Sequence, residues 1–318
     1  MIKKMICIAV CTWMCASCEK SDGGGVFEPV EPPVEKPEEP EKPAAPPSTE
    51  DLFTIKINDE IMAVVGSNEW YGIAYGNGKY VAVGQKGYVT TSTDGVNWTT
   101  PKTDGGYKSL LGIAFGKGKF ITGSSTVAGT IMSSTDGNAW TTVANITNSD
   151  LQNFRYVNDL FFVDSGNGYS YVSADGITWE QINSIRLVND ITYNNGLYVA
   201  ACYNGIIATS NDGKAWTPYT LGAKSWLDVA YGKGKFVAIG VAGLLTTSVD
   251  GHAWTKPTQV VSIRWVFLIY KDGMFVAISQ NGYMTTSSDG ETWTEPVQMK
   301  DESGNNVTSW IQDMIAVP

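Results

Sequence analysis

Hydrophobic positions from residue 52 onward fall into short runs separated by glycine-rich turns. In the segment from Trp70 to Trp98, an apolar strand is followed by the turn Gly76-Asn77-Gly78, an alternating strand, a second turn and a third strand. A fourth strand begins at Trp98. Short apolar or alternating runs bounded by Gly, Asn and Asp are typical of β-strands joined by hairpin turns. The pattern therefore predicts repeated units of four antiparallel strands.

The motif Ser-x-Asp-Gly-x-x-Trp marks these units and occurs six times. Its aspartates are spaced by 42, 39, 37, 38 and 39 residues, and a period near forty with four strands per unit is typical of a propeller blade. The motif residues are Asp94, Asp136, Asp175, Asp212, Asp250 and Asp289, with Trp98, Trp140, Trp179, Trp216, Trp254 and Trp293. We expect Ser and Asp to hydrogen-bond the turn backbone and Trp to pack on the sheet. The role is structural, because the same residues recur in every unit.

Partial units lie at both ends of the repeated region. Residues 310–317 repeat the first strand of a unit, and residues 52–58 and 60–65 are strand-like runs ahead of the first complete unit. We expect the three runs to pair, because that pairing closes the ring and leaves no open sheet edge. The predicted fold class is all-β, a β-propeller of seven four-stranded blades in which N- and C-terminal strands close the last blade. Six blades are the alternative.

Composition agrees with this fold class and argues against others. With 43% hydrophobic and 17% charged residues, a chain of 318 residues can bury a sizeable core. Its 34 glycines and 11 tryptophans favour short strands and tight turns. The formal net charge of -10 argues against a nucleic-acid partner, because phosphate binding needs clustered Lys and Arg. The third repeat, with Asn158-Asp159 at its first turn, is the least regular.

The first 17 residues have the features of an export signal. Two lysines precede an apolar run that is too short to span a bilayer as a stable helix. The segment Cys15-Ala16-Ser17-Cys18 resembles the bacterial lipobox, although Cys15 stands where that family prefers Leu. The resemblance implies that residues 1–17 are removed and that Cys18 is acylated. Ordinary secretion is the alternative.

Residues 18–50 are predicted to be an acidic, proline-rich tether, and residues 51–318 the propeller. Residues 29–47 hold eight of the 13 prolines, interleaved with Glu and Lys, a composition that cannot bury enough apolar surface to fold. The acidic stretch after Cys18 resembles the surface-export signals of Bacteroidetes lipoproteins. We therefore expect a lipid-anchored protein of the outer membrane or cell surface, and we expect it to be a monomer.

Few residues offer covalent or metal chemistry. Cys202 is the one cysteine of the predicted propeller region, and we interpret it as a small buried hydrophobic residue. The one histidine, His252, lies inside a repeated turn, which argues against a catalytic Cys–His pair. We predict no cofactor, no metal site and no catalytic residues.

The six motifs resemble those of the BNR or Asp-box repeat superfamily, which includes sialidases, sortilin-type receptors and photosystem II assembly factors. The resemblance covers nearly all of residues 52–318. It implies the propeller fold and leaves the function open, because box-bearing propellers include enzymes, receptors and assembly factors.

The likeness to sialidases implies three arginines on a substrate carboxylate, a Tyr with a supporting Glu as nucleophile, and an Asp as acid/base. This chain has three arginines, Arg155, Arg186 and Arg264. However, Arg155 is placed at a different depth in its irregular blade, and we identify no acid pair at a shared height. The family's arginine-bearing motif near the start of the fold is also absent. An exo-glycosidase of the sialidase type is therefore the alternative function.

We predict instead a non-enzymatic module that binds a glycan or a protein at the cell envelope, and a purely structural spacer is a third hypothesis. If the Asp-box turns share one face with the turns after the first strands, the opposite face consists of the remaining turns and the connections between blades. The candidate ligand-binding residues there are Trp70, Trp226, Trp265, Trp310, Arg264 and Arg186. An aromatic ring at the channel mouth could stack sugars or hold a peptide. Alternatively, these tryptophans fill the spaces between blades.

Overall fold

The computed structural model describes residues 48, 52–57, 60–66, 69–103, 109–125, 129–147, 149–222, 224–301 and 303–316. The chain divides into two compact units, Met1–Ala44 and Ala45–Pro318, and all described residues belong to the second. The predicted signal peptide, Cys18 and all of the tether except residue 48 lie outside the described residues. No helix in the described part is long and apolar enough to cross a membrane.

The described residues form strands β1 to β27 and one short 3-10 turn, η1 (Val241–Gly243). Six groups of four strands follow one another along the chain, and each pairs in sequence order as an antiparallel meander. The first group is β3 (Trp70–Gly76), β4 (Lys79–Gly84), β5 (Tyr88–Ser92) and β6 (Lys102–Thr103), and the second is β7 (Leu110–Gly116), β8 (Lys119–Ser124), β9 (Thr130–Ser134) and β10 (Thr141–Asn145). The third group is β11 (Leu151–Val157), β12 (Leu160–Ser165), β13 (Ser170–Ser173) and β14 (Glu180–Ile182), and the fourth is β15 (Val188–Asn194), β16 (Leu197–Cys202), β17 (Ile206–Ser210) and β18 (Thr217–Thr220). The fifth group is β19 (Trp226–Gly232), β20 (Lys235–Gly240), β21 (Leu244–Ser248) and β22 (Thr258–Gln259), and the sixth is β23 (Trp265–Lys271), β24 (Met274–Ser279), β25 (Tyr283–Ser287) and β26 (Val297–Gln298).

A three-stranded closing sheet joins the two ends of the repeated region. The C-terminal strand β27 (Ile311–Ala316) pairs with β2 (Glu60–Gly66), which pairs with β1 (Leu52–Ile57). Both pairings are antiparallel, and β2 lies between the other two strands. β27 therefore takes the place of the first strand of a group, β2 that of the second and β1 that of the third. The predicted pairing of the terminal runs is therefore confirmed.

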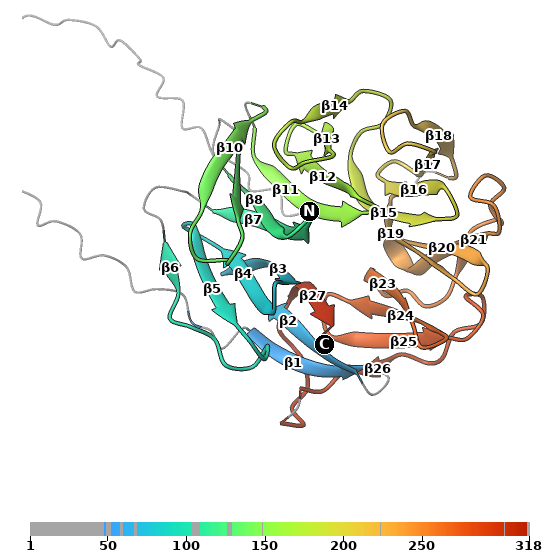
Figure 1. Cartoon of the computed structure of the whole chain (residues 1–318). Helices are drawn as coiled ribbons and strands as arrows, with labels where there is room; N and C mark the ends of the chain where they lie inside the picture. Colours follow the sequence, from blue (N-terminus) through green and yellow to red (C-terminus); the bar gives the residue numbers. More distant parts are fainter. Residues whose placement is uncertain are drawn as a thin grey trace, which may run out of the picture. The chain divides into compact units, whose positions relative to one another are not determined.

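The sheets surround a centre, with the first strand of each group on the inside (Figure 1). Buried hydrophobic residues of the described part form seven clusters, and each cluster lies between two neighbouring sheets. One cluster joins the last complete sheet to the closing sheet through Val276, Ile278, Val64 and Ile311. The all-β propeller fold is thus as predicted, and the seven interfaces between sheets favour seven blades over six.

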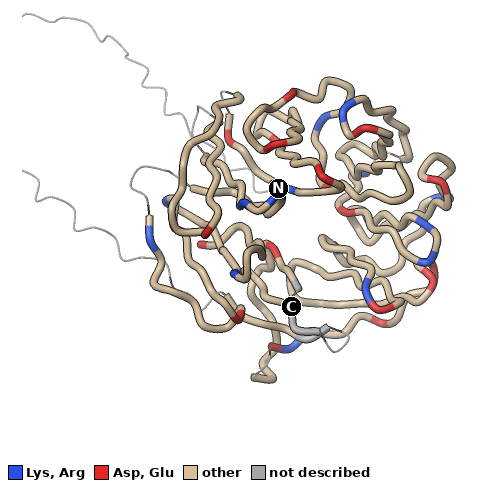
Figure 2. Tube along the Cα trace, viewed as in Figure 1, with Lys and Arg blue, Asp and Glu red and all other residues tan. Residues whose placement is uncertain are grey.

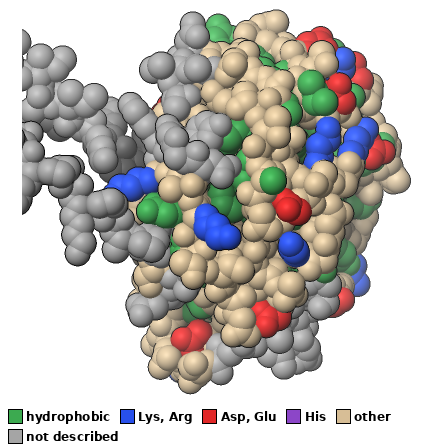
Figure 3. Space-filling view, turned by 60° about the vertical axis from the view of Figure 1, so that its left-hand side comes forward, with side chains coloured by type: hydrophobic (Ala, Val, Ile, Leu, Met, Phe, Trp, Pro, Cys, Tyr) green, Lys and Arg blue, Asp and Glu red, His purple; other side chains and the backbone are tan. Residues whose placement is uncertain are grey.

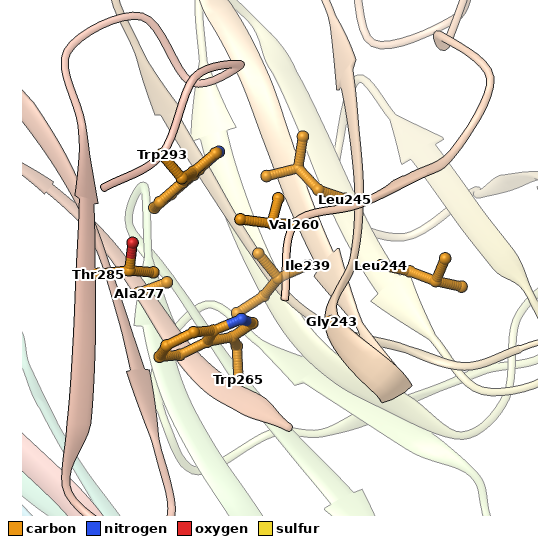
Figure 4. Close-up of a pocket in the computed structure, with 9 residues that line it drawn as sticks. All are labelled: Ile239, Gly243, Leu244, Leu245, Val260, Trp265, Ala277, Thr285 and Trp293. Carbon is orange, nitrogen blue, oxygen red and sulfur yellow. The ribbon is translucent and has the colours of Figure 1, made fainter. Parts of the chain in front are cut away.

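The Trp of each Ser-x-Asp-Gly-x-x-Trp motif packs at the interface between its own sheet and the preceding one. Trp216, for example, contacts Phe162 and Tyr198, with ring centroids 6.5 and 6.3 Å apart. Trp293 lines a small apolar cavity between the fifth and sixth groups, together with Trp265 (Figure 4). Because each such Trp bridges two sheets, it stabilises the contact between blades as well as its own turn.

The irregular third group closes its first hairpin without glycine. Asn158 and Asp159 have φ values of 43° and 64°, which is the left-handed pair that a two-residue type I′ turn requires. Asn and Asp tolerate this conformation better than other non-glycine residues. The first strand of this group, β11, also joins β7 of the previous group through one parallel pairing, Gln152 with Leu111.

Candidate functional site

The motif turns and the turns after the first strands lie on one face. The Asn77 side-chain amide donates to the carbonyl oxygens of Gly118, in the next first turn, and Thr135, in the next motif turn, at 3.0 and 2.9 Å. The opposite face, called here the connection face, holds the turns between second and third strands and the connections between groups. There, Tyr203 N donates to Leu187 O at 3.0 Å, which ties a turn to the preceding connection.

Each motif uses its polar side chains within its own turn. Ser248 Oγ donates to Asp250 Oδ1 at 3.0 Å and accepts from Gly251 N at 2.8 Å. Asp250 Oδ1 also accepts from the backbone N–H groups of Ala253 and His252, each at 2.8 Å, and these bonds lower the pKa of Asp250 to about 2. The same arrangement recurs at the other five motifs. The hydrogen bonds thus hold the turn in its conformation.

Three of the four candidate ligand-binding tryptophans are in the core. Trp70, Trp226 and Trp265 are only 0%, 1% and 2% exposed, so they cannot offer a stacking face to a ligand. Their rings need small residues opposite them, and Trp70 and Trp226 pair with Gly84 and Gly240. The expected aromatic ring at the channel mouth is therefore wrong, and these tryptophans fill the spaces between blades.

Trp310 differs from the other three because its register is shifted by one residue. Ile311, not Trp310, pairs with Gly66 in the way that Trp226 pairs with Gly240. Ile311 is accordingly buried, with 1% exposure, whereas Trp310 is 40% exposed. A one-residue slip moves a side chain from the core to the surface, and Trp310 is therefore free to contact a ligand.

Trp310 and Arg264 line one pocket of about 440 Å³ on the connection face. We call it the Arg264 groove, and its lining also includes Gln280, Asn281 and Tyr283. It lies where the connection before β23 and the turn after β24 meet the start of the closing sheet. Tyr283 is 39% exposed. Arg264 makes no ion pair or hydrogen bond with any other described residue.

Arg186 lines a separate pocket of about 490 Å³ on the same face, with Leu187, Tyr203 and Asn204. Unlike Arg264, it is held by protein groups. Its guanidinium carbon lies 3.8 Å from the ring centre of Tyr169, and its Nη2 donates to the Asn167 carbonyl at 3.0 Å. The structure therefore places the two predicted arginines in different pockets and leaves one of them unpaired.

A polar cavity of about 230 Å³ lies among the inner strands and was not predicted. Its lining includes Tyr71, Arg155, Asp190, Asp228 and Asp313, from five different first strands. Acidic positions occur on inner strands as well as on outer turns (Figure 2). An enzyme would show this combination of an arginine, a tyrosine and carboxylates around one cavity.

Arg155 is engaged by protein groups. Its side chain is 11% exposed, and it forms ion pairs with Asp164 at 2.9 Å and Asp190 at 3.4 Å. It also donates to the carbonyl oxygens of Asn153 and Asn189. Burial alone would lower the pKa of Arg155, but the two carboxylates raise it. Arg155 is therefore charged and held in place by internal partners.

Asp190 and Asp228 form a hydrogen-bonded acid pair at equivalent positions of neighbouring first strands. This pair corrects the sequence interpretation that found no acid pair at a shared height. Burial raises the pKa of both groups, and the adjacent Asp190 charge raises the pKa of Asp228 well above its usual value. Two carboxylates in contact cannot both ionise easily, so Asp228 holds its proton more tightly than an ordinary aspartate does.

Two of the inner-strand aspartates also connect their first strand to the next one around the ring. Asp228 accepts from Leu268 N of the following group at 2.8 Å, and Asp313 accepts from Ile73 N at 2.9 Å. Burial raises the pKa of Asp313 to about 6. In the sequence, Asp190, Asp228 and Asp313 share one feature: each stands two residues after the first residue of a first strand, as in Val188-Asn189-Asp190. No group of three or more His, Cys, Asp or Glu residues in the described part is arranged to hold a metal ion.

Comparisons with known proteins show the fold alone. No protein-family model matches the chain, and no curated protein matches it. Among solved structures, it is similar to "YCF48 bound to D1 peptide", with 15% identity and a TM-score of 0.59 over 76% of this chain and 87% of that one. It is also similar to YCF48 from Cyanidioschyzon merolae, with 14% identity and a TM-score of 0.56 over 80% and 89% of the two chains. Virginiamycin B lyase from Staphylococcus aureus shares 9% identity, with a TM-score of 0.60 over 72% and 84%.

Proposed function

We propose that the chain is a non-enzymatic binding module whose connection face holds a glycan or a protein partner at the cell envelope. The observation that carries the proposal is the Arg264 groove, which combines an unpaired guanidinium with two half-exposed aromatic rings. Aromatic and Arg side chains in a concave pocket are the groups that contribute most to binding. The similarity to a propeller solved with a bound peptide supports a binding role.

The alternative is an exo-glycosidase of the sialidase type acting in the central cavity. Its acid pair speaks against this role, because Asp190 and Asp228 are hydrogen-bonded to each other. The mechanism implied by the likeness to sialidases needs an aspartic acid that is free to exchange a proton with the substrate, whereas the two carboxyl oxygens of Asp228 accept from the backbone N–H groups of Val229 and Leu268. Arg155, in turn, is engaged by Asp164, Asp190 and two backbone carbonyls.

The proposed address is the outer membrane or the cell surface, through a lipid on Cys18 and the acidic tether of residues 18–50. It is supported by the lipobox-like segment and by the tether composition. Labelling cells with a radioactive fatty acid tests it directly. We expect the wild-type protein to be labelled and membrane-bound, whereas Cys18→Ala should be unlabelled. Equal labelling of the two proteins would contradict the anchor.

The function is tested by screening the purified protein on a glycan array and a peptide library, with a parallel assay for released sugar. We expect binding without any release of sugar. Release of sugar that is lost in Asp228→Asn would establish the enzyme instead. A folded protein that binds nothing in either screen would favour the structural spacer.

A further inference from the structure

We infer that the Arg264 groove binds a carboxylate-bearing sugar residue of an acidic glycan. This inference rests on the proposed function and names the ligand class of that face. Arg264 is the one charged residue among the described residues that line the groove, on a chain of net charge -10. An arginine without an internal partner binds a carboxylate through two parallel hydrogen bonds. The groove is therefore a local site for an anion on an acidic protein.

The basic groups of this protein are otherwise dispersed. On the side shown in Figure 3, Lys and Arg side chains are separated by uncharged side chains and do not form a continuous basic patch. Lys214 and Lys235 pair with Glu180 and Glu291 at 2.6 and 2.5 Å, and Arg186 is held by Tyr169 and Asn167. A single unpaired guanidinium suits one carboxylate of a sugar ring better than a densely charged polyanion.

The aromatic residues of the groove supply planar surfaces for a sugar ring. Trp310 and Tyr283 are 40% and 39% exposed, and both line the pocket beside Arg264. The C–H face of a pyranose carries a small positive charge and packs on the negative face of an aromatic ring. Tyr283 belongs to β25, and Trp310 directly precedes β27, so the ligand contacts both the sixth group and the segment that enters the closing sheet.

Polar groups for sugar hydroxyls lie in the turn after β24. The backbone carbonyls of Gln280 and Asn281 accept from Ile311 N and the Gln298 side chain, both at 3.1 Å. These bonds fix the turn, and Gln280 and Asn281 are among the residues that line the groove. An amide group offers both donors and an acceptor, which matches hydroxyl groups that also donate and accept.

The groove is less suited to an extended peptide. Peptides that add to a sheet need an unpaired strand edge, whereas this pocket is built from a turn and two connections. Its volume of about 440 Å³ falls in the range of pockets for small ligands. The end or a side residue of a glycan is therefore the favoured occupant.

The test is isothermal titration of the purified full chain, in detergent micelles, with two matched ligand pairs. One pair is galacturonic-acid oligomers and their carboxyl-reduced forms, and the other is sialyllactose and lactose. The variants are Arg264→Gln and Trp310→Ala, and Lys256→Gln is the matched control, because it removes one exposed positive charge outside the groove. Circular dichroism melting confirms that each variant is folded.

We expect the wild type to bind at least one acidic member and to bind its neutral counterpart about 10- to 100-fold more weakly, the usual effect of a charged hydrogen-bonded pair. Arg264→Gln should remove this preference, Trp310→Ala should weaken the binding of both ligands, and Lys256→Gln should match the wild type. Equal binding of acidic and neutral sugars, or unchanged binding by Arg264→Gln, would overturn the inference while leaving the binding function intact. Binding of carboxylate-ended peptides only would replace the glycan by a protein partner.

Discussion

Trp265 and Trp310 both stand at or next to the start of a first strand, but Trp265 is buried and Trp310 is exposed. Replacing each by alanine should therefore change the free energy of unfolding by different amounts. Trp265 is 2% exposed and packs between the fifth and sixth groups. A buried tryptophan removes roughly 150 to 250 Å² from water, which at about 25 cal/mol per Å² is an upper limit of about 4 to 6 kcal/mol. Its Nε1 has no hydrogen-bond partner among the described residues, so its removal also relieves an unpaired donor worth about 1 to 3 kcal/mol.

We therefore expect Trp265→Ala to lower the free energy of unfolding by about 3 kcal/mol, near the lower end of the range for such substitutions. Trp310→Ala should lower it by less than about 1 kcal/mol, because the side chain is 40% exposed. Urea unfolding followed by tryptophan fluorescence and circular dichroism measures both changes. Equal losses in the two variants, or wild-type stability in Trp265→Ala, would refute the assigned register and packing.

Three further predictions concern polar groups. Ser248→Ala should lower the free energy of unfolding, measured in urea, by about 1 to 3 kcal/mol, because Ser248 is buried and its Oγ accepts a hydrogen bond from Gly251 N. An unchanged free energy of unfolding would mean that the turn does not need this bond. Arg155→Met should lower the free energy of unfolding by about 3 to 5 kcal/mol, because it leaves the buried Asp164 without its cation. Adding Asp164→Asn should recover part of this loss. Wild-type stability in Arg155→Met alone would contradict the ion pair. Asp313 has a pKa raised by burial to about 6, so the folded state binds its proton more tightly than the unfolded state does. Stability should therefore decrease, by up to about 3 kcal/mol, as pH rises from 4 through 6, and Asp313→Asn should flatten this decrease; an unchanged slope would show that Asp313 does not titrate in this way.

The repeated turns and the closure of the ring could be predicted because their signals are local. Six motifs at near-constant spacing fix where the blades repeat, and a half-unit at each end indicates how they join. The structure shows that β27 pairs with β2 as this pattern requires. A regular repeat therefore carries most of the information about this fold.

The candidate site could be predicted only in part, because burial depends on register. The sequence that begins at Trp310 resembles the first strand that begins at Trp226. In the structure, however, Gly66 pairs with Ile311 and not with Trp310. Hydrophobicity alone could not distinguish these registers. Only the aspartate at position 313, which corresponds to Asp228, identifies the correct alignment.

The polar cavity was missed for a different reason. Asp190, Asp228 and Arg155 come from three repeats and meet only when the first strands surround the centre. Nothing in the local sequence reports that Arg155 binds Asp164 and Asp190. The acid pair consists of aspartates within two first strands, β15 and β19.

We propose that ligands bind on the connection face. A glycan array that compares variants of the two faces tests this most directly. Arg264→Gln with Trp310→Ala alters the connection face, and Val249→Ser alters the opposite face at a side chain that is 72% exposed. We predict that the first protein loses the wild-type glycan signal and that the second retains it. Retention of the signal by the first protein and its loss in Val249→Ser would place the binding site on the motif face and contradict the account.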